Sequence, residues 1–187
     1  MSNQALAARH SMDSPEWYTP VAFVDSAREV MGGIDLDPAS HAEANGTVQA
    51  ARYFTAEDDG LSHTWRGRVF LNPPGGLVQR FWRHLILEWQ HARVQQCVWI
   101  GYSLEQLQTI QMVDVSVTPL DFPICITRRR IAFVENEAKK AERIAKLRAA
   151  GKNPNKASSP SHSNYVTYIG PNIEAFRRVF RAFGAVR

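Results

Sequence analysis

Residues 69–74 read Val69-Phe70-Leu71-Asn72-Pro73-Pro74, an apolar run that ends in a carboxamide and two prolines. Its β-branched and aromatic residues are typical of a buried strand, and the prolines end strand hydrogen bonding and stiffen the backbone. Gly75 and Gly76 come next, and glycines let another backbone or a flat ligand approach closely. The stretch therefore predicts a buried strand that ends either in an ordinary tight turn or at the edge of a binding site.

The segments around this strand alternate between helix and strand patterns. Apolar residues recur every four positions from Leu77 to His91, which predicts a helix with a broad apolar face. Another helix is expected between Thr19-Pro20, which can cap and start it, and Gly32-Gly33, which can end it. Further strands are predicted at 34–38, 51–55, 96–100, 123–127, 130–134 and 165–169, and further helices from Ser103 and at 172–183. The alternation predicts a three-layer α/β domain with a mostly parallel sheet.

Length and composition bound the class of protein. The chain has 187 residues, which suits one domain, and its 44% hydrophobic and 21% charged residues are typical of a globular fold. No apolar run reaches the roughly 18 residues of a membrane helix, and the N-terminal residues lack the apolar core of a signal peptide. We therefore expect no membrane partner and a cytoplasmic location, which is the host cytoplasm if a phage encodes the chain.

Neither a metal site nor a disulfide is expected. Cys97 and Cys125 each lie inside an apolar segment, which favours buried free thiols. The six histidines are scattered without the spacing of metal ligands. The chemistry predicted for this chain therefore uses no metal.

Positive charge is concentrated in residues 135–162. All five lysines lie there with Arg143 and Arg148, against three glutamates, and this segment accounts for the whole net charge of +4. Its first half favours helix but carries only Ile144 and Leu147 as sizeable apolar side chains, and its second half is turn-rich. Such a segment is either a solvated insertion or a surface that meets a polyanion. The predicted organisation is a flexible tail at 1–14, a domain at 15–134 and 163–187, and a basic helix-plus-loop insertion at 135–162.

Acidic and amide side chains follow three of the predicted strands. Asp35 and Asp37 lie at the end of the first, Asp58 and Asp59 follow the second, and Asn72 follows the third. In open α/β sheets ligands bind at the carboxyl ends of strands where the strand order reverses, so neighbouring strands would bring these groups to one crevice. Carboxylates there can accept hydrogen bonds from ribose hydroxyls or an ammonium, and an asparagine oxygen can hold an amine without titrating. The acids also suit simple turns.

Five segments, in this order, resemble those of the phage-type DNA adenine-N6 methyltransferases. The likeness spans roughly Glu16 to Val134 and resumes at 161–170. Asn-Pro-Pro alone is a weak motif, but the order and spacing of the five segments are fairly specific. The segments are Glu16-Trp17-Tyr18-Thr19-Pro20, IDLDPAS at 34–40, YFTAEDDGL at 53–61, WRGRVFLNPP at 65–74 and RRRIAF at 128–133. The resemblance implies the Rossmann-like fold of enzymes that use S-adenosylmethionine (SAM).

The resemblance also implies a cofactor and its contacts. SAM would be the methyl donor, and its contacts would come from the N-terminal motif and from the first two strand ends. The implied cofactor residues are Trp17, Thr19 and Pro20 at the methionine end, Asp35 and Asp37 at the polar groups, and Asp58 or Asp59 near the adenosine half.

The implied catalytic group is Asn72-Pro73-Pro74, and the implied acceptor is adenine in DNA, expected to be double-stranded. The Asn72 oxygen and the Pro73 carbonyl would accept hydrogen bonds from the exocyclic amine, which favours a pyramidal nitrogen that can attack the methyl group in line. The base must be flipped from the duplex, which costs a few kcal/mol and requires an aromatic stacking partner. Methylation could protect phage DNA in a restriction-modification setting or serve another purpose.

This chain departs from the family pattern at two places. The family commonly has an aromatic residue directly after Asn-Pro-Pro, where this chain has Gly75, and base stacking is worth about 1–3 kcal/mol. Trp82, Phe81 or Tyr18 are candidates to replace it. No glycine-rich loop follows Asp37. Two alternatives therefore remain open: a non-catalytic module that binds DNA or a protein, and a methyltransferase for another planar nitrogen.

Contacts to DNA are expected from the basic segment and from the arginines that precede it. The sequence does not predict an oligomeric state. A polyanion partner suits clustered lysines and arginines, and Trp82 is the expected base contact. The predicted DNA residues are Trp82, Arg128, Arg129, Arg130, Lys139, Lys140, Arg143, Lys146, Lys152 and Lys156.

Overall fold

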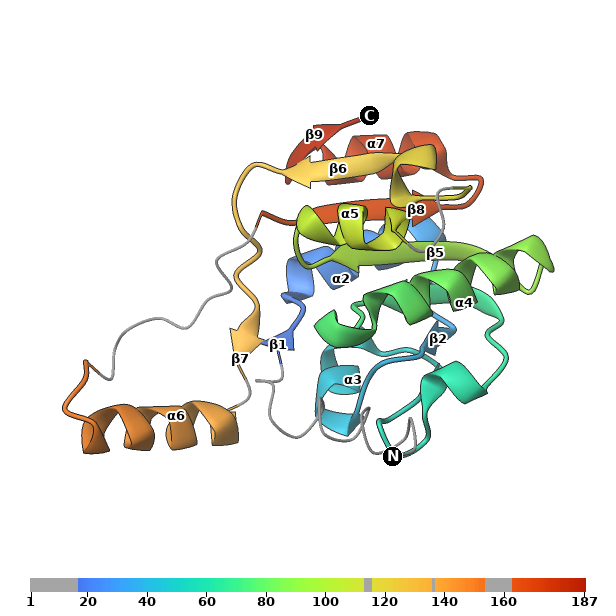
Figure 1. Ribbon diagram of the computed structural model, residues 1–187. Helices are drawn as coiled ribbons and strands as arrows, with labels where there is room; N and C mark the ends of the chain where they lie inside the picture. Colours follow the sequence, from blue (N-terminus) through green and yellow to red (C-terminus); the bar gives the residue numbers. More distant parts are fainter. Residues whose placement is uncertain (1–16, 113–115, 136, 154–162) are drawn as a thin grey trace.

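A seven-stranded mixed sheet forms the middle layer of the molecule (Figure 1). The structure is a computed structural model, and it describes residues 17–112, 116–135, 137–153 and 163–187. The strand order is β3-β2-β4-β5-β8-β6-β9, and β8 and β9 run against the other five. The strands are β2 (Leu36–Asp37), β3 (Arg52–Tyr53), β4 (Gly67–Leu71), β5 (Val94–Gly101), β6 (Ile124–Thr127), β8 (Tyr165–Ile169) and β9 (Gly184–Val186).

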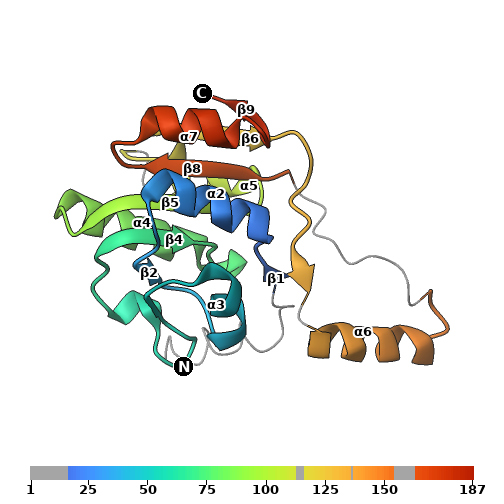
Figure 2. The same ribbon diagram turned by 180° about the vertical axis from the view of Figure 1, so that it is seen from behind.

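Helices cover both faces of this sheet, which confirms the predicted three-layer α/β architecture. One face carries α2 (Val21–Met31) and α7 (Ile173–Phe180), seen in front in Figure 2. The opposite face carries α4 (Val78–Gln90) and α5 (Glu105–Gln111), and α3 (Ala42–Val48) connects β2 to β3. The fold is compatible with the Rossmann-like methyltransferase type that the sequence predicts.

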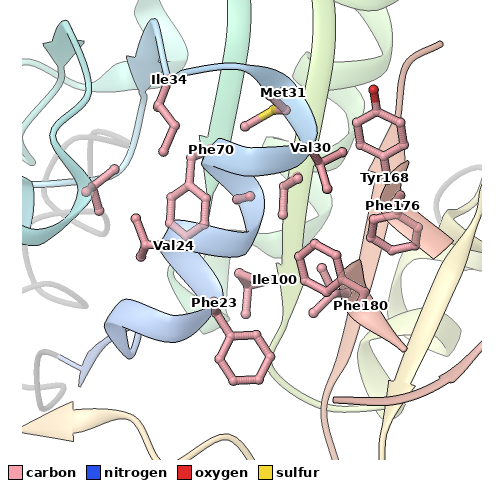
Figure 3. Close-up of a cluster of buried hydrophobic side chains, with 14 of the residues drawn as sticks. Phe23, Val24, Val30, Met31, Ile34, Phe70, Ile100, Tyr168, Phe176 and Phe180 are labelled. Atoms are coloured by element: carbon pink, nitrogen blue, oxygen red, sulfur yellow. The ribbon is translucent and has the colours of Figure 1, made fainter. Parts of the chain in front are cut away.

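The core has one half on each face of the sheet. Figure 3 shows the half beneath α2 and α7, where Phe23, Phe70 and Phe180 lie in one cluster. In the other half Trp82 of α4 packs edge-on against Trp99 of β5, with ring centroids 5.1 Å apart. The apolar face predicted for residues 77–91 is thus the buried face of α4.

The ends of α2 follow from local chemistry, with one difference from the prediction. Pro20 itself holds the N-cap position, so Thr19 lies outside the helix and makes no cap. At the other end Gly32 takes a left-handed φ of 77°, and its N–H donates to the Arg28 carbonyl at 2.8 Å. Because glycine adopts this conformation without steric strain, the helix ends where the sequence predicts.

The strand predicted at 130–134 is wrong over most of its length. The Ile131 N–H donates to the Asn164 side chain at 2.8 Å, so Ile131 and Phe133 are buried in a loop that is tied by a side chain. A strand, β7 (Val134–Glu135), begins only at the end of this run. It pairs antiparallel with β1 (Trp17–Tyr18) in a separate two-stranded ribbon.

The helix α6 (Glu137–Ala149) follows this ribbon and stands away from the three layers (Figures 1 and 2). It forms the first half of the predicted basic insertion. Residues 1–14, predicted as a tail, and residues 154–162 of the predicted loop lie outside the described residues.

Two further observations concern the described residues alone. None of their helices is both long enough and apolar enough to cross a membrane. They also contain no group of three or more His, Cys, Asp and Glu side chains that could hold a metal ion, and both cysteines are free and buried.

Candidate functional site

The strand order reverses between β2 and β4. From β2 the chain continues through α3 to β3 at the sheet edge, and it then returns to the other side of β2 as β4. All three strands are parallel, with Leu36 paired to Arg52 on one side and to Val69 on the other. The carboxyl ends of these strands therefore meet at one edge of the sheet, where open α/β folds bind ligands. Asp37, Asn72 and the residues after Tyr53 lie at this edge.

Asp37 ends β2 as a buried carboxyl group with only 4% of its surface exposed. One of its oxygens accepts the Ala39 N–H at 3.2 Å. Burial raises the pKa of Asp37 to about 7, although the Ala39 N–H and the Ser40 hydroxyl act in the opposite direction. The group thus titrates near neutrality, and a donor or a cation placed beside it would favour its ionised form.

Asp35 is engaged by Arg68 and also lines a surface hollow. The Arg68 Nη2 lies 2.6 Å from one Asp35 oxygen, and its Nε and backbone N–H lie 2.9 and 2.8 Å from the other. The hydrogen bond from Arg68 holds the pKa of Asp35 below its usual value. Since the same guanidinium donates to the Gly32 carbonyl at 2.7 Å, this cluster joins the start of β4 to the turn before β2.

Asp58 and Asp59 shape a turn after β3. Asp58 accepts the N–H and the hydroxyl of Thr55, both at 2.9 Å, and these bonds lower its pKa. Asp59 takes a left-handed φ of 51° and accepts the Leu61 N–H at 3.3 Å. A Cβ on the next residue, Gly60, would overlap the carbonyl oxygen of Pro38. The turn therefore lies directly against the residue that follows Asp37.

Asn72 and Pro73 follow β4 at the reversal, with Asn72 half-buried and Pro73 buried. Pro74 is exposed, and its carbonyl accepts the Leu77 N–H at 2.9 Å, which forms the 3₁₀ turn Gly75–Leu77 that leads into α4. Because neither proline carries an N–H, the loop presents carbonyl acceptors and the Asn72 amide.

Gly75 leaves open space beside this loop. A Cβ built on it would meet no atom within 4 Å, and its φ lies outside the left-handed region. The position therefore accepts a side chain, even though the chain has none there.

Of the three aromatic residues expected to stack on a base, only Tyr18 is accessible. Trp82 is 1% exposed, and its indole N–H donates to the Val117 carbonyl at 2.9 Å. The prediction that Trp82 contacts the base is therefore wrong, because its side chain belongs to the core. Phe81 is buried as well and packs on Trp65.

The N-terminal motif lies beside the loop that follows Asp37. The Tyr18 hydroxyl donates to a Glu43 oxygen at 3.0 Å, and its ring centroid is 5.1 Å from that of His41. Thr19 is buried and Pro20 starts α2. The backbone of Trp17 pairs with Glu135, while its side chain lies outside the described part.

The predicted DNA residues fall into three groups. Arg128, Arg129 and Arg130 are exposed, and Arg128 donates to the Arg181 carbonyl at 3.0 Å. On α6, Arg143 binds Glu135 with two nitrogens and Lys146 lies 2.7 Å from Glu142. Lys140 and Lys152 are described, whereas Lys156 and the side chain of Lys139 lie outside the described residues.

Surface hollows among the described residues include two whose linings contain neither Asp37 nor Asn72. One, of about 440 Å³, lies along α4 and is lined by Arg80, Arg83 and Val117 among others. The other, of about 370 Å³, is lined by Arg52, Phe54 and neighbouring residues. The second hollow is also lined by Asp35, one of the predicted acceptor groups, whereas neither lining includes Asp37 or Asn72.

Sequence reasoning missed two residues that organise the site, Arg68 and Gly60. Arg68 lies inside the WRGRVF segment, and its partner Asp35 is 33 positions earlier, so only the register of β2 and β4 reveals the pair. Gly60 after two aspartates reads as a turn, and its approach to Pro38 depends on tertiary structure.

Comparison with known proteins identifies one family. A family model described as DNA N-6-adenine-methyltransferase (Dam) matches residues 8–149. Neither the curated proteins nor the solved structures that were compared give a match. The matched range includes Asp37, Asn72 and α6.

Proposed function

The chain belongs to the DNA N-6-adenine-methyltransferase (Dam) family, and from this premise we propose how the groups at the strand ends perform the reaction. The enzyme transfers a methyl group to the N6 amine of adenine in DNA. We place SAM and a flipped adenine at the edge where Asp37 and Asn72 emerge. The observation that supports this most strongly is that these residues follow neighbouring strands at the reversal of strand order.

Asp37 fits a cationic, hydroxyl-bearing cofactor. When bound, SAM supplies a positively charged sulfonium whose methyl group is transferred. Within the described residues, no cationic side chain contributes to the pKa shift of Asp37, so its buried carboxyl lacks the partner that Asp35 has in Arg68. We assign Asp37 to the polar groups of SAM, and the β1 motif with Thr19 and Pro20 to its methionine end. We assign Asp58 and Asp59 an indirect role, because the turn that they form packs against Pro38, the residue after Asp37.

Asn72 and Pro73 orient the acceptor amine. Two carbonyl oxygens that accept its N–H groups favour a pyramidal nitrogen, whose lone pair is then free to attack. Since Pro73 and Pro74 donate no hydrogen bond, nothing in the loop backbone at these positions competes for that lone pair. Orientation and fixed dipoles supply the catalysis in this proposal, and no residue has to act as a strong base.

DNA binding is assigned to α6 and to Arg128, Arg129 and Arg130. Exposed cations on a projecting helix suit a phosphate backbone, which carries a dense negative charge. N6 of adenine faces the major groove, so a methyl group there changes what an endonuclease reads. On this ground we extend the proposal to modification of phage DNA against restriction.

The test is transfer of tritium from labelled SAM to unmethylated genomic DNA, followed by nucleoside analysis. We expect label in N6-methyladenine with the native chain. The Asn72→Ala variant should lose at least about a hundredfold in rate, as for removal of one electrostatic catalytic group, while SAM binding measured by calorimetry is retained. Label in cytosine, or full activity of Asn72→Ala, would contradict the proposal.

A further inference from the structure

The helix α6 is attached to the body through the β1–β7 ribbon. Figures 1 and 2 show α6 extending away from the three layers, with β7 directly before it. β7 pairs antiparallel with β1, with Trp17 opposite Glu135 and Tyr18 opposite Val134. Because β1 leads straight into α2, the ribbon connects the basic helix to the segment that enters the candidate site.

An ion pair between Glu135 and Arg143 is a second connection between the ribbon and the helix, in addition to the chain itself. The Arg143 Nε lies 2.9 and 3.2 Å from the two Glu135 oxygens, and its Nη2 lies 2.9 Å from one of them. The Glu135 side chain is only 9% exposed and that of Arg143 is 26% exposed. The hydrogen bond that Arg143 donates to Glu135 also raises the pKa of Arg143. A bidentate, largely desolvated pair of this kind is stronger and more directional than a surface ion pair.

The other ion pair of α6 provides a contrast. Lys146 and Glu142 lie one turn apart on the same helix, and their side chains are 76% and 62% exposed. This ion pair lies within one helix, so it does not by itself join α6 to the ribbon. Glu135, in contrast, is fixed to the body by its strand pairing, so its hold on Arg143 constrains the direction of α6.

We infer that Glu135 and Arg143 are a positioning pair that fixes the direction of α6 relative to the candidate site, and that Arg143 does not contact phosphate. This rests on the proposed function of α6 as the DNA-binding helix. It changes the role expected for one of the seven cations of the segment, from a DNA contact to a support for the others.

The decisive variant is Glu135→Gln, because the two roles of Arg143 predict opposite signs. If the pair positions α6, Glu135→Gln and Arg143→Gln each weaken binding to a random-sequence duplex, on the order of tenfold. Glu142→Gln is the matched control, since it removes the same charge from an exposed site, and we expect it to strengthen binding slightly. The exchange Glu135→Arg with Arg143→Glu should recover most of the affinity.

The salt dependence of DNA binding is a second way to distinguish a positioning role of Arg143 from direct phosphate binding. Removing one cation that binds a phosphate lowers the slope of log Kobs against log salt by about 0.9. We expect Arg143→Gln to leave the slope unchanged while it lowers affinity. A reduced slope, or tighter binding by Glu135→Gln like that of Glu142→Gln, would overturn the inference.

A measurement without DNA keeps this inference separate from the proposed function. Spin labels at Ala149→Cys and Gln90→Cys, both exposed, report the direction of α6, because the native cysteines are buried. We expect a narrow distance distribution that broadens in Glu135→Gln and in Arg143→Gln, but not in Glu142→Gln. Identical distributions in all variants would refute the positioning role. If the native chain binds no DNA, the proposed function of α6 fails and this measurement still decides the inference.

Discussion

At the scale of single residues, two aspartates two positions apart have opposite environments. Asp35 is paired with Arg68 and its pKa is lowered, whereas Asp37 is buried and its pKa is raised to about 7. The sequence DLD gives no means to tell them apart, because both lie on the same side of one extended segment. The register of β2 against β4 places Arg68 beside the first and leaves the second at the strand end.

The raised pKa of Asp37 predicts a pH-dependent stability. Between its ordinary value near 3.8 and about 7, the folded protein keeps a proton that the unfolded chain releases, so the free energy of unfolding falls as pH rises through this window. Urea unfolding at pH 5 and pH 7.5 should show a decrease of a few kcal/mol. The Asp37→Asn variant should lose this decrease and also lose SAM binding. An equal pH dependence in both proteins would contradict the burial argument.

Gly75 offers a gain-of-function prediction. The Gly75→Tyr variant should change the free energy of unfolding by less than about 0.5 kcal/mol, because the added side chain meets open space. If the flipped base lies beside this loop, the new ring should tighten binding to a duplex with adenine opposite an abasic site by about fivefold or more. Gly46→Tyr, at another glycine with no neighbour, is the control. No difference between the two variants would place the base elsewhere.

At the scale of elements, α4 was predictable and the ribbon was not. The helical spacing of apolar residues at 77–91 matches the buried face of α4. Trp82 belongs to this apolar face, so its side chain lies in the core and not beside a base. The apolar run before Val134 resembles a strand in composition, yet its buried backbone is satisfied by Asn164 from a distant segment. Two-residue strands such as β1 and β7 carry too little pattern to be recognised.

The Asp35–Arg68 connection should matter for stability and not for cofactor binding. Asp35→Asn removes a charged partner from Arg68, and we expect it to lower the free energy of unfolding by about 1 kcal/mol, since both side chains are about one-third exposed. SAM affinity by calorimetry should stay within about twofold. Loss of SAM binding in Asp35→Asn, with stability unchanged, would return Asp35 to the cofactor site.

At the scale of the whole molecule, charge and chemistry occupy different places. The acceptor groups lie at one edge of the sheet, and Lys140 and Lys146 lie on a helix that stands clear of the layers (Figure 1). The sequence alone indicates both regions, because charge clustering and strand-end residues are local signals. Their connection through the β1–β7 ribbon required the three-dimensional structure.

Neutralising the lysines of α6 and its end should reduce the electrostatic part of DNA binding. The triple variant Lys140→Gln, Lys146→Gln and Lys152→Gln should lower the slope of log Kobs against log salt by up to about 2.7, or about 0.9 for each phosphate that a lysine no longer neutralises. SAM binding should not change. The control removes three exposed arginines elsewhere, with Arg66→Gln, Arg80→Gln and Arg83→Gln. Equal slopes for the two triple variants would show that α6 is not the DNA-binding surface.

The position of α6 away from the three layers has a consequence for protein engineering. Among the described residues, the β1–β7 ribbon and the Glu135–Arg143 ion pair join α6 to the three layers. We therefore expect that the helix can be exchanged as a cassette, provided that Glu135 and an arginine at position 143 are kept. If α6 binds phosphates as proposed, swapping its outward residues between homologous enzymes should change the affinity for DNA while the chemistry stays intact, because phosphate contacts do not read sequence.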